Sequence, residues 1–355
     1  MILCIAGDPG GSRAVLPLAE ALFRQGKTIR VPRHGTLARE LPPHMAACLC
    51  DESEVIALLP QCKALVFGSS TDDAWPLAMA RAAKEHGAII MHVLDNWSSY
   101  RERLCTDGLP PLMPDIYATM DEESRKGAEA EGVPADSLVI TGHPGLAAAA
   151  GTVEAIMRRA ETPRDPAAPV SIAFVCEPFS LVFGRDCRTK GHPGFTEEIV
   201  LKSLAAVLAS RADPKGVFVY LLPHPKQRPE DIARLWEKVR GPLEGRVLSL
   251  SHGRDALGMV SGVAGMASIL LYEAWMGGLP VLSVQQDCRM PSMRRFASLK
   301  GINYADTNTA IPKAVEAWLR QCRNAVPKPR PELLLHKNAP KNAVKILLQR
   351  MGDME

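Results

Sequence analysis

Residues 256–281 read ALGMVSGVAGMASILLYEAWMGGLPV, and this stretch indicates which class of fold the chain adopts. No charged side chain occurs from Ala256 to Tyr272, a length close to the roughly 20 residues that a membrane-spanning helix needs. Glycines at 258, 262 and 265 interrupt the run, however, and Glu273 ends it before Gly277-Gly278-Leu279-Pro280. The pattern therefore predicts a short buried element, a tight loop and a helix, and it argues against a membrane span.

Upstream of this stretch, short apolar runs alternate with longer amphipathic runs, which is the pattern of βαβ units around a parallel sheet. The predicted strands of the first half are Ile2–Ala6, Ala64–Phe67, Ala88–Leu94, Ile116–Thr119 and Leu138–Thr141. The predicted helices are Arg13–Gln25, Asp51–Leu59, Asp72–His86, Glu122–Glu131 and Leu146–Arg159.

A proline-rich segment, Thr162–Pro169, interrupts the alternation and marks a domain boundary. Beyond it the predicted strands are Ser171–Val175, Val217–Leu222, Arg246–Leu250 and Val281–Val284, with a short element near Met259–Gly262. The predicted helices are Phe195–Arg211, Pro229–Arg240, Ser268–Met276 and Ile311–Gln321. We therefore predict an α/β protein with two doubly wound, Rossmann-like domains, residues 1–161 and 170–325. Residues 326–355 hold a last helical run, Pro331–Met351, that could cross back onto the first domain.

The composition limits the classes of partner and compartment. The 355 residues, 46% of them hydrophobic, can fill two cores, and 42 basic against 39 acidic side chains create no general field for polyanions. Nucleic acid is therefore not an expected partner. Nine cysteines without a CxxC pair indicate a reducing compartment and argue against a zinc ribbon. The first residues, MILCIAGD, lack the basic region of a signal peptide, so we predict a cytoplasmic protein.

Open parallel sheets bind ligands outside the carboxyl ends of their strands, so the residues after each predicted strand are candidates. Residues 7–12, Gly-Asp-Pro-Gly-Gly-Ser, let the backbone approach a ligand beside a helix N-terminus, although a tight turn with Ser12 as N-cap is the alternative. Residues 95–103, DNWSSYRER, place an acid, two aromatic rings and two arginines at a strand end. These groups suit a sugar or acceptor pocket, and a capped surface helix is the alternative.

Two further candidates lie in the second half. His224 stands between Pro223 and Pro225, which restrict its backbone, and Lys226 would suit a phosphate; a structural histidine is the alternative. The glycine loop at residues 262–268 opens a helix and could offer N–H groups to a phosphate. Glu273 is the only charge on that apolar helix, so it should be paired, hold a ligand hydroxyl, or be a buried structural glutamate.

Together these motifs resemble the GT-B superfamily, which holds nucleotide-sugar glycosyltransferases and the related UDP-N-acetylglucosamine 2-epimerases. The chain is most similar to the bacterial surface-carbohydrate members. The motifs are Asp8-Pro9-Gly10-Gly11, Asp95-Asn96-Trp97, His224-Pro225, Gly265-Met266-Ala267-Ser268, Glu273-Ala274 and Gly278-Leu279-Pro280-Val281. The resemblance implies two Rossmann-like domains facing a cleft, with the acceptor bound mainly by the first domain and the nucleotide donor by the second.

The resemblance also implies roles for residues of the second domain. Glu273 matches the acid that holds the donor ribose, and Gly265, Met266, Ala267 and Ser268 match the loop that meets the phosphates. His224-Pro225 is similar to the motif of transferases that use CMP-sialic acid, CMP-Kdo or CDP-activated donors, and Glu177-Pro178 resembles the segment near the base or phosphates. The retaining-enzyme pattern of two glutamates eight residues apart is absent, because Gly265 occupies the earlier position.

We therefore expect an inverting, metal-independent glycosyltransferase without a cofactor, which moves a sugar from a UDP-, CMP- or CDP-linked donor to a glycan, lipid-linked or protein acceptor. Asp8 and Asp95 are the candidate bases, with Asp8 preferred by position, and His224, Lys226 and the loop N–H groups would stabilise the leaving phosphate. The residues expected at the acceptor are Gly10, Gly11, Ser12, Trp97, Tyr100 and Arg101. No Asp-x-Asp motif is present, which agrees with a site that holds no metal.

Three alternatives stay open on the same residues. A nucleotide-sugar 2-epimerase or hydrolase would need carboxylates beside the sugar but no acceptor, and the available acids are Asp95, Asp121, Glu122 and Glu123. A non-catalytic protein could bind a nucleotide or glycan in the same cleft. Peripheral contact with anionic headgroups is also conceivable, through Arg101, Arg103, Lys337, Lys341, Lys345 and Arg350, although a solvated helix face is the preferred explanation.

Overall fold

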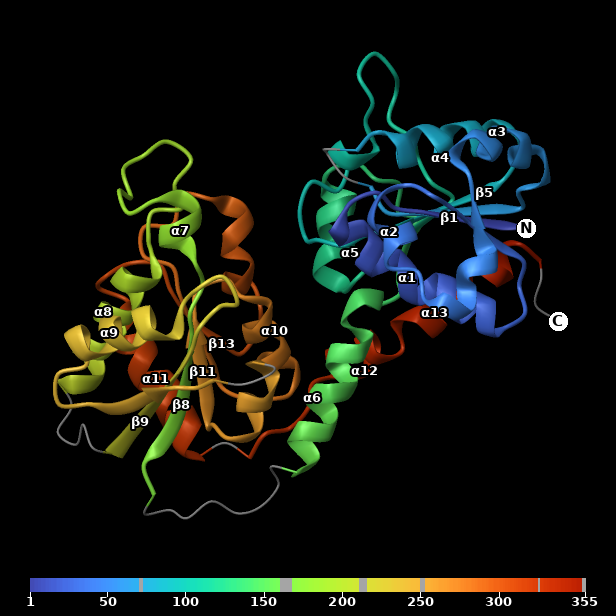
Figure 1. The fold of residues 1–355 in the computed structure, drawn as a ribbon. Coiled ribbons are helices and arrows are strands. Elements are labelled where there is room, and N and C mark those ends of the chain that lie inside the picture. The colour runs from blue at the N-terminus through green and yellow to red at the C-terminus, as the bar shows by residue number, and fades with distance from the viewer. Residues whose placement is uncertain (70–72, 160–167, 211–215, 250–252, 325, 353–355) are drawn as a thin grey trace. The chain divides into compact units, whose positions relative to one another are not determined.

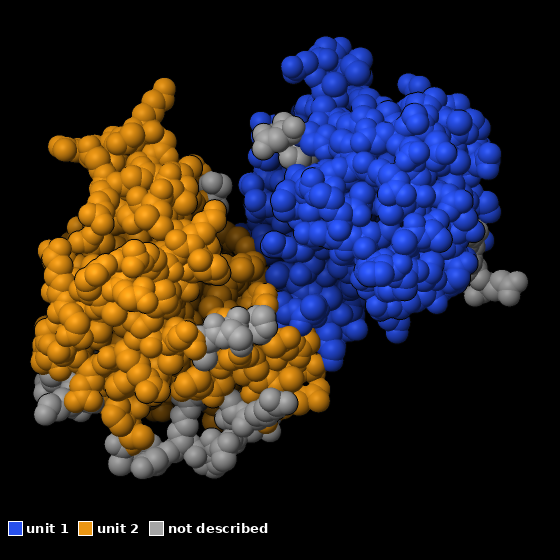
Figure 2. Space-filling model, in the orientation of Figure 1, with its two compact units in different colours: residues 1–150, 334–355 blue, residues 151–333 orange. Residues whose placement is uncertain are grey.

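The computed structural model describes residues 1–69, 73–159, 168–210, 216–249, 253–324 and 326–352. The chain forms two compact units, each with its own parallel sheet (Figure 2). Unit 1 consists of residues 1–150 and 334–355, and unit 2 of residues 151–333. Most of the predicted proline-rich boundary, residues 160–167, lies outside the described residues.

Unit 1 is built on a seven-stranded parallel sheet with the strand order β3-β2-β1-β4-β5-β6-β7. The strands are β1 Ile2–Ile5, β2 Ile29–Pro32, β3 Leu49–Cys50, β4 Ala64–Phe67, β5 Ile89–Val93, β6 Ile116–Thr119 and β7 Leu138–Ile140. Strands β2 and β3 lie on one side of β1, and strands β4 to β7 lie on the other side. The carboxyl ends of β1 and β4 are therefore the topological switch point, where doubly wound sheets bind ligands.

Helices cover both faces of this sheet (Figure 1). They are α1 Pro9–Arg24, α2 Gly35–Arg39, α3 Val55–Leu58, α4 Trp75–Glu85, α5 Glu122–Ala130 and, from the end of the chain, α13 Ala339–Arg350. The side chains of β1 alternate between the two faces, so Ile2 and Cys4 pack with α1 and α13, whereas Leu3 and Ile5 pack in the core that contains α4. The last helix thus completes the core of the unit that holds the N-terminus.

Unit 2 repeats the design with six parallel strands in the order β10-β9-β8-β11-β12-β13. The strands are β8 Val170–Val175, β9 Val217–Leu222, β10 Glu244–Val247, β11 Gly262–Gly265, β12 Val281–Val284 and β13 Ile302–Ala305. The helices are α7 Phe179–Phe183, α8 Glu197–Ala209, α9 Pro229–Val239, α10 Ile269–Met276 and α11 Ile311–Asn324. Helices α6 Ala147–Arg159 and α12 Pro331–Lys337 each continue across the division between the units. The switch point of this sheet lies at the carboxyl ends of β8 and β11.

The predicted fold class, two doubly wound parallel α/β domains, is confirmed. The stretch from Ala256 to Tyr272 forms a short 3-10 helix, strand β11 and the start of α10, and no described helix is long and apolar enough to cross a membrane. Several element predictions were wrong. Strands β2, β3 and β13 were missed, and the run predicted as one helix from Asp51 to Leu59 is broken into short 3-10 and α turns around α3.

Candidate functional site

The loop after β1 in unit 1 contains the first candidate group. Helix α1 begins at Pro9, four residues before the predicted start, and Asp8 is its N-cap. The carboxylate of Asp8 accepts hydrogen bonds from Gly10 N at 2.9 Å and Gly11 N at 3.3 Å. The alternative with Ser12 as N-cap is wrong, because Asp8 supplies the cap and the Ser12 hydroxyl donates to Ala6 O. The acid that we preferred as a base therefore closes the helix end that was expected to face a ligand.

Two other carboxylates lie in close contact with this loop. Asp95, directly beyond β5, lies over Gly10, and Asp73 lies over Gly7, so a Cβ on either glycine would collide with the carboxylate. Asp95 forms an ion pair with Arg103, and both side chains are mostly buried. The Asp95 carbonyl oxygen also lies 3.1 Å from Nε2 of His143, beyond β7. The switch point of unit 1 thus carries acids on both sides of one glycine loop.

His34, which the sequence analysis did not single out, joins this group from the end of β2. Its Nε2 lies 2.7 Å from Asp73 Oδ2 and its Nδ1 lies 3.2 Å from Glu52 Oε1. The ring packs against Trp75, with the ring centroids 4.4 Å apart. An imidazolium would donate to both carboxylates, and loss of either proton would leave a nitrogen lone pair against a carboxylate oxygen. His34 and Asp73 together form an arrangement that can store and deliver a proton.

The residues expected at an acceptor occupy different environments. Trp97 donates through Nε1 to Asp121 Oδ2 at 2.7 Å, and Asp121 also caps helix α5 by accepting from Ser124 N. Tyr100 is buried in the core of unit 1, where its carbonyl oxygen accepts from the Tyr117 hydroxyl. Arg101 is exposed. Of the three predicted acceptor side chains in this segment, Tyr100 is therefore a core residue.

At the switch point of unit 2, Glu177 occupies the site where a phosphate was expected. Its carboxylate accepts from Met266 N at 3.0 Å and from Ala267 N at 2.9 Å, just before α10. Burial raises the pKa of Glu177 to about 7, against the lowering effect of these N–H groups. Gly265 is the last residue of β11, so it does not belong to the loop. The backbone donors that the sequence assigned to a ligand phosphate are thus bound by the protein's own acid.

Glu273 is paired, one of the outcomes that its position on an apolar helix predicted. Arg254 donates to its carboxylate through Nε at 2.6 Å and through Nη2 at 2.8 Å. The Glu273 side chain is 1% exposed, whereas that of Arg254 is 38% exposed. Ser268 is the N-cap of α10, with its hydroxyl accepting from Leu270 N. A ligand hydroxyl could reach Glu273 only by sharing its carboxylate with Arg254.

His224 follows β9 and is held by its own loop. The backbone N–H of His224 donates to Gln227 Oε1 at 3.0 Å, and the ring Nδ1 accepts from the backbone N–H of Lys226 at 3.1 Å. The neutral ring therefore carries its proton on Nε2. Burial lowers the pKa of His224, and Lys226 lowers it further, so the ring is neutral at pH 7 and can donate from Nε2. Pro225 and Lys226 are exposed beside it.

The described residues of unit 2 thus bring Glu177, Met266, Ala267 and Ser268 together at one switch point. His224 lies at the end of β9, the strand beside β8, and Glu273 lies one helical turn into α10. In the part of the chain that the structure describes, no group of three His, Cys, Asp or Glu side chains is arranged to hold a metal ion.

This two-unit fold is that of the UDP-N-acetylglucosamine 2-epimerases. The chain is similar to the enzyme of Neisseria meningitidis bound to UDP-GlcNAc, with 12% identity, 98% of this chain and 99% of that chain covered, and a TM-score of 0.59. It is similar to the enzyme of Methanocaldococcus jannaschii, with 13% identity, 98% and 99% covered, and a TM-score of 0.60. It is also similar to S. aureus MnaA in complex with UDP, with 14% identity, 99% and 97% covered, and a TM-score of 0.56. No protein-family model matches the sequence, and no curated protein matches it.

These likenesses correct the expected activity. The glycosyltransferase prediction is wrong, because solved structures similar to this chain over 98% of its length or more are UDP-GlcNAc 2-epimerases. The prediction rested on short motifs, among them His224-Pro225. The resemblance to 2-epimerases, which the same motifs implied, is retained.

Proposed function

We propose that this protein is a nucleotide-sugar 2-epimerase, or a hydrolase of such a sugar, that acts without an acceptor. The observation that carries the proposal is the likeness of the entire chain to 2-epimerases, across both units. Two features of the described residues support it. Unit 1 offers acids around one glycine loop, and unit 2 offers a neutral donor, His224, at the end of β9, the strand beside β8.

Inversion at C2 of a sugar needs a base that removes the C2 proton and an acid that returns a proton to the opposite face. Unit 1 supplies two candidate groups, Asp95 with Arg103 and His34 with Asp73, and the His34 side chain makes no cap hydrogen bond although the residue precedes α2. They lie over Gly10 and Gly7 of the same loop, so one bound sugar ring could meet both. Asp8 and Asp121 are the N-caps of α1 and α5, and we assign them structural roles.

Unit 2 is assigned the nucleotide. His224 would donate from Nε2 to a phosphate oxygen, and Glu273 would share its carboxylate between Arg254 and the ribose hydroxyls. Because Glu177 already binds the N–H groups of Met266 and Ala267, a ligand phosphate must either bind beside it or displace it. UDP is the first base to test, and CMP and CDP are compared with it.

The experiment is acceptor-free incubation with UDP-GlcNAc, followed by separation of UDP-N-acetylmannosamine and free UDP. Epimer or free UDP should form without any acceptor, and Asp95→Asn and His34→Gln should each lower the rate by about 10²–10⁴-fold. Asp136→Asn, an exposed acid of the same unit, is the matched control and should leave the rate unchanged. Intact UDP-, CMP- and CDP-sugars after prolonged incubation would contradict the proposal.

A further inference from the structure

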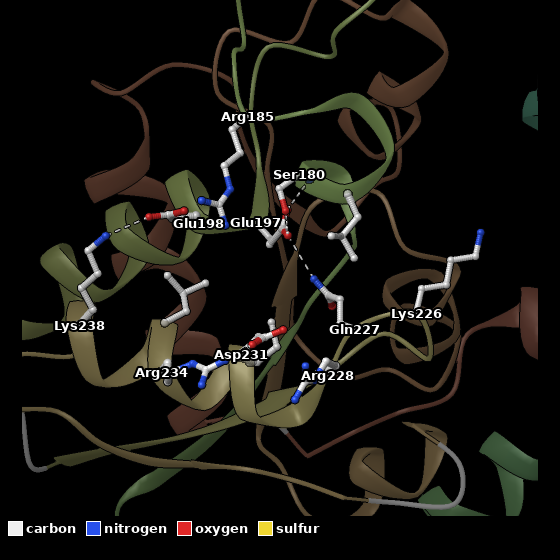
Figure 3. A pocket seen from close by; sticks show the side chains of 13 residues that line it. Ser180, Arg185, Glu197, Glu198, Lys226, Gln227, Arg228, Asp231, Arg234 and Lys238 are labelled. Atoms are coloured by element: carbon white, nitrogen blue, oxygen red, sulfur yellow. Dashed lines mark hydrogen bonds and ion pairs between the residues drawn. The ribbon is translucent and has the colours of Figure 1, made fainter.

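Unit 2 contains a hollow of about 560 Å³ beside the loop that carries His224. Helices α7, α8 and α9 and the loop after β9 form its walls (Figure 3). Its volume lies within the roughly 300–1,000 Å³ typical of small-molecule sites. Lys226 of its lining was expected at a leaving phosphate, but the proposed function uses none of the lining residues.

The lining is charged, with five cationic and three acidic side chains. Each acid already has a partner: Glu198 pairs with Lys238 at 3.3 Å and Asp231 pairs with Arg234. Glu197 accepts from Ser180 N at 2.9 Å. Glu198 and Asp231 are therefore neutralised by cations of the protein, whereas Glu197 is hydrogen-bonded by the neutral groups of Ser180 and Gln227.

Two arginines of the lining are not paired with any acid of the hollow. Arg185, in the loop after α7, has no ion pair among the described residues, and Arg228 Nε only reaches 4.0 Å from Glu230 Oε2. Lys226 also lines the hollow, although Figure 3 shows its side chain pointing away from the others. The arrangement leaves an excess of positive charge, and the guanidinium fork matches the oxygens of an anion.

Apolar side chains line the rest of the hollow. Leu235 and the buried Ile232 come from one face of α9, and Leu181 comes from α7. A free inorganic ion would gain nothing from this surface, whereas an organic molecule would bury it.

We propose that this hollow binds a phosphate-bearing small organic molecule, such as a phosphorylated sugar, with Arg185 and Arg228 holding the phosphate. The binding does not depend on the proposed epimerase activity. One contact links the two regions: Gln227 donates to Glu197 in the wall and accepts from the His224 N–H at 3.0 Å. A ligand in the hollow would therefore act first on the conformation of the His224 loop.

The test is isothermal titration of the full chain with glucose 6-phosphate, with glucose and inorganic phosphate as partial probes. Glucose 6-phosphate should bind more tightly than either part. Arg185→Gln and Arg228→Gln should each weaken binding about tenfold or more. Both positions are exposed, so the variants should keep the fold, which circular dichroism checks.

Arg158→Gln is the matched control, because Arg158 is an exposed arginine of unit 2 outside the hollow, and it should bind as the wild type does. Equal binding of inorganic phosphate and glucose 6-phosphate would overturn the proposal. So would binding that survives in the Arg185→Gln/Arg228→Gln double variant, which would place the probe elsewhere, and so would absence of saturable binding.

Discussion

Glu177 gives the sharpest prediction of how stability depends on pH. In the folded protein its pKa lies at about 7, against an ordinary value of 4.5, because the carboxyl is buried. The folded state therefore binds the proton more tightly than the unfolded chain, and stability falls as the pH rises from about 4.5 to about 7. The difference between the two pKa values corresponds to about 3 kcal/mol in all, of which about 2.5 kcal/mol falls between pH 5 and pH 8.

The side chain introduced by Glu177→Gln is neutral at every pH, so the variant should not lose stability in this way as the pH rises. One carboxylate oxygen, Oε2, accepts from both the Met266 and the Ala267 N–H groups, and the amide oxygen of the variant can take its place, so any penalty of the substitution does not change with pH. Denaturant unfolding at pH 5, 6, 7 and 8 should show the variant gaining about 2.5 kcal/mol relative to the wild type as the pH rises. Glu230→Gln, an exposed acid of the same unit, should run parallel to the wild type. Parallel profiles for Glu177→Gln and wild type would refute the reasoning.

Three further predictions concern the packing of α13, the Arg254–Glu273 ion pair and the glycine loop of unit 1. Leu347→Ala removes a fully buried side chain of α13 and should lower the free energy of unfolding by about 3 kcal/mol; an unchanged denaturation midpoint would contradict this packing. Arg254→Met leaves the buried carboxylate of Glu273 without its partner and should lower the free energy of unfolding by about 3–5 kcal/mol. Glu273→Leu should lower it less, because the guanidinium that it leaves is partly exposed. A larger loss for Glu273→Leu in denaturant unfolding would contradict this prediction. Gly10→Ala pushes a Cβ into Asp95 and should lower the acceptor-free rate about 10²-fold, so full activity would argue against the loop as part of the site.

The sequence was sufficient for the fold class because the long amphipathic helices and apolar strands repeat in order. It missed β2 and β3 because the first is four residues with an arginine inside and the second only two. The start of α1 was predictable after all. Asp8 followed by Pro9 is an N-cap before a proline at the first helical position, a signal that outweighs the paired glycines, which favour a loop.

The candidate site was only partly within reach of the sequence. The positions of Asp95, His224 and Glu273 follow from strand and helix ends, which periodicity locates. The partners that define their chemistry come from distant segments, as with Arg254 on Glu273 and Met266 on Glu177. His34 carried no local signal, since its role depends on Asp73, 39 residues further along the chain.

The central claim is that this protein exchanges the C2 proton of a nucleotide sugar without an acceptor. The most direct measurement is incubation with UDP-GlcNAc in D₂O, followed by proton NMR of the C2 position of substrate and product. The account predicts that deuterium replaces the C2 proton in step with the formation of UDP-N-acetylmannosamine, and that Asp95→Asn and His34→Gln slow this exchange. Retention of the C2 proton while the enzyme turns over, or transfer of the sugar only when an acceptor is added, would contradict it.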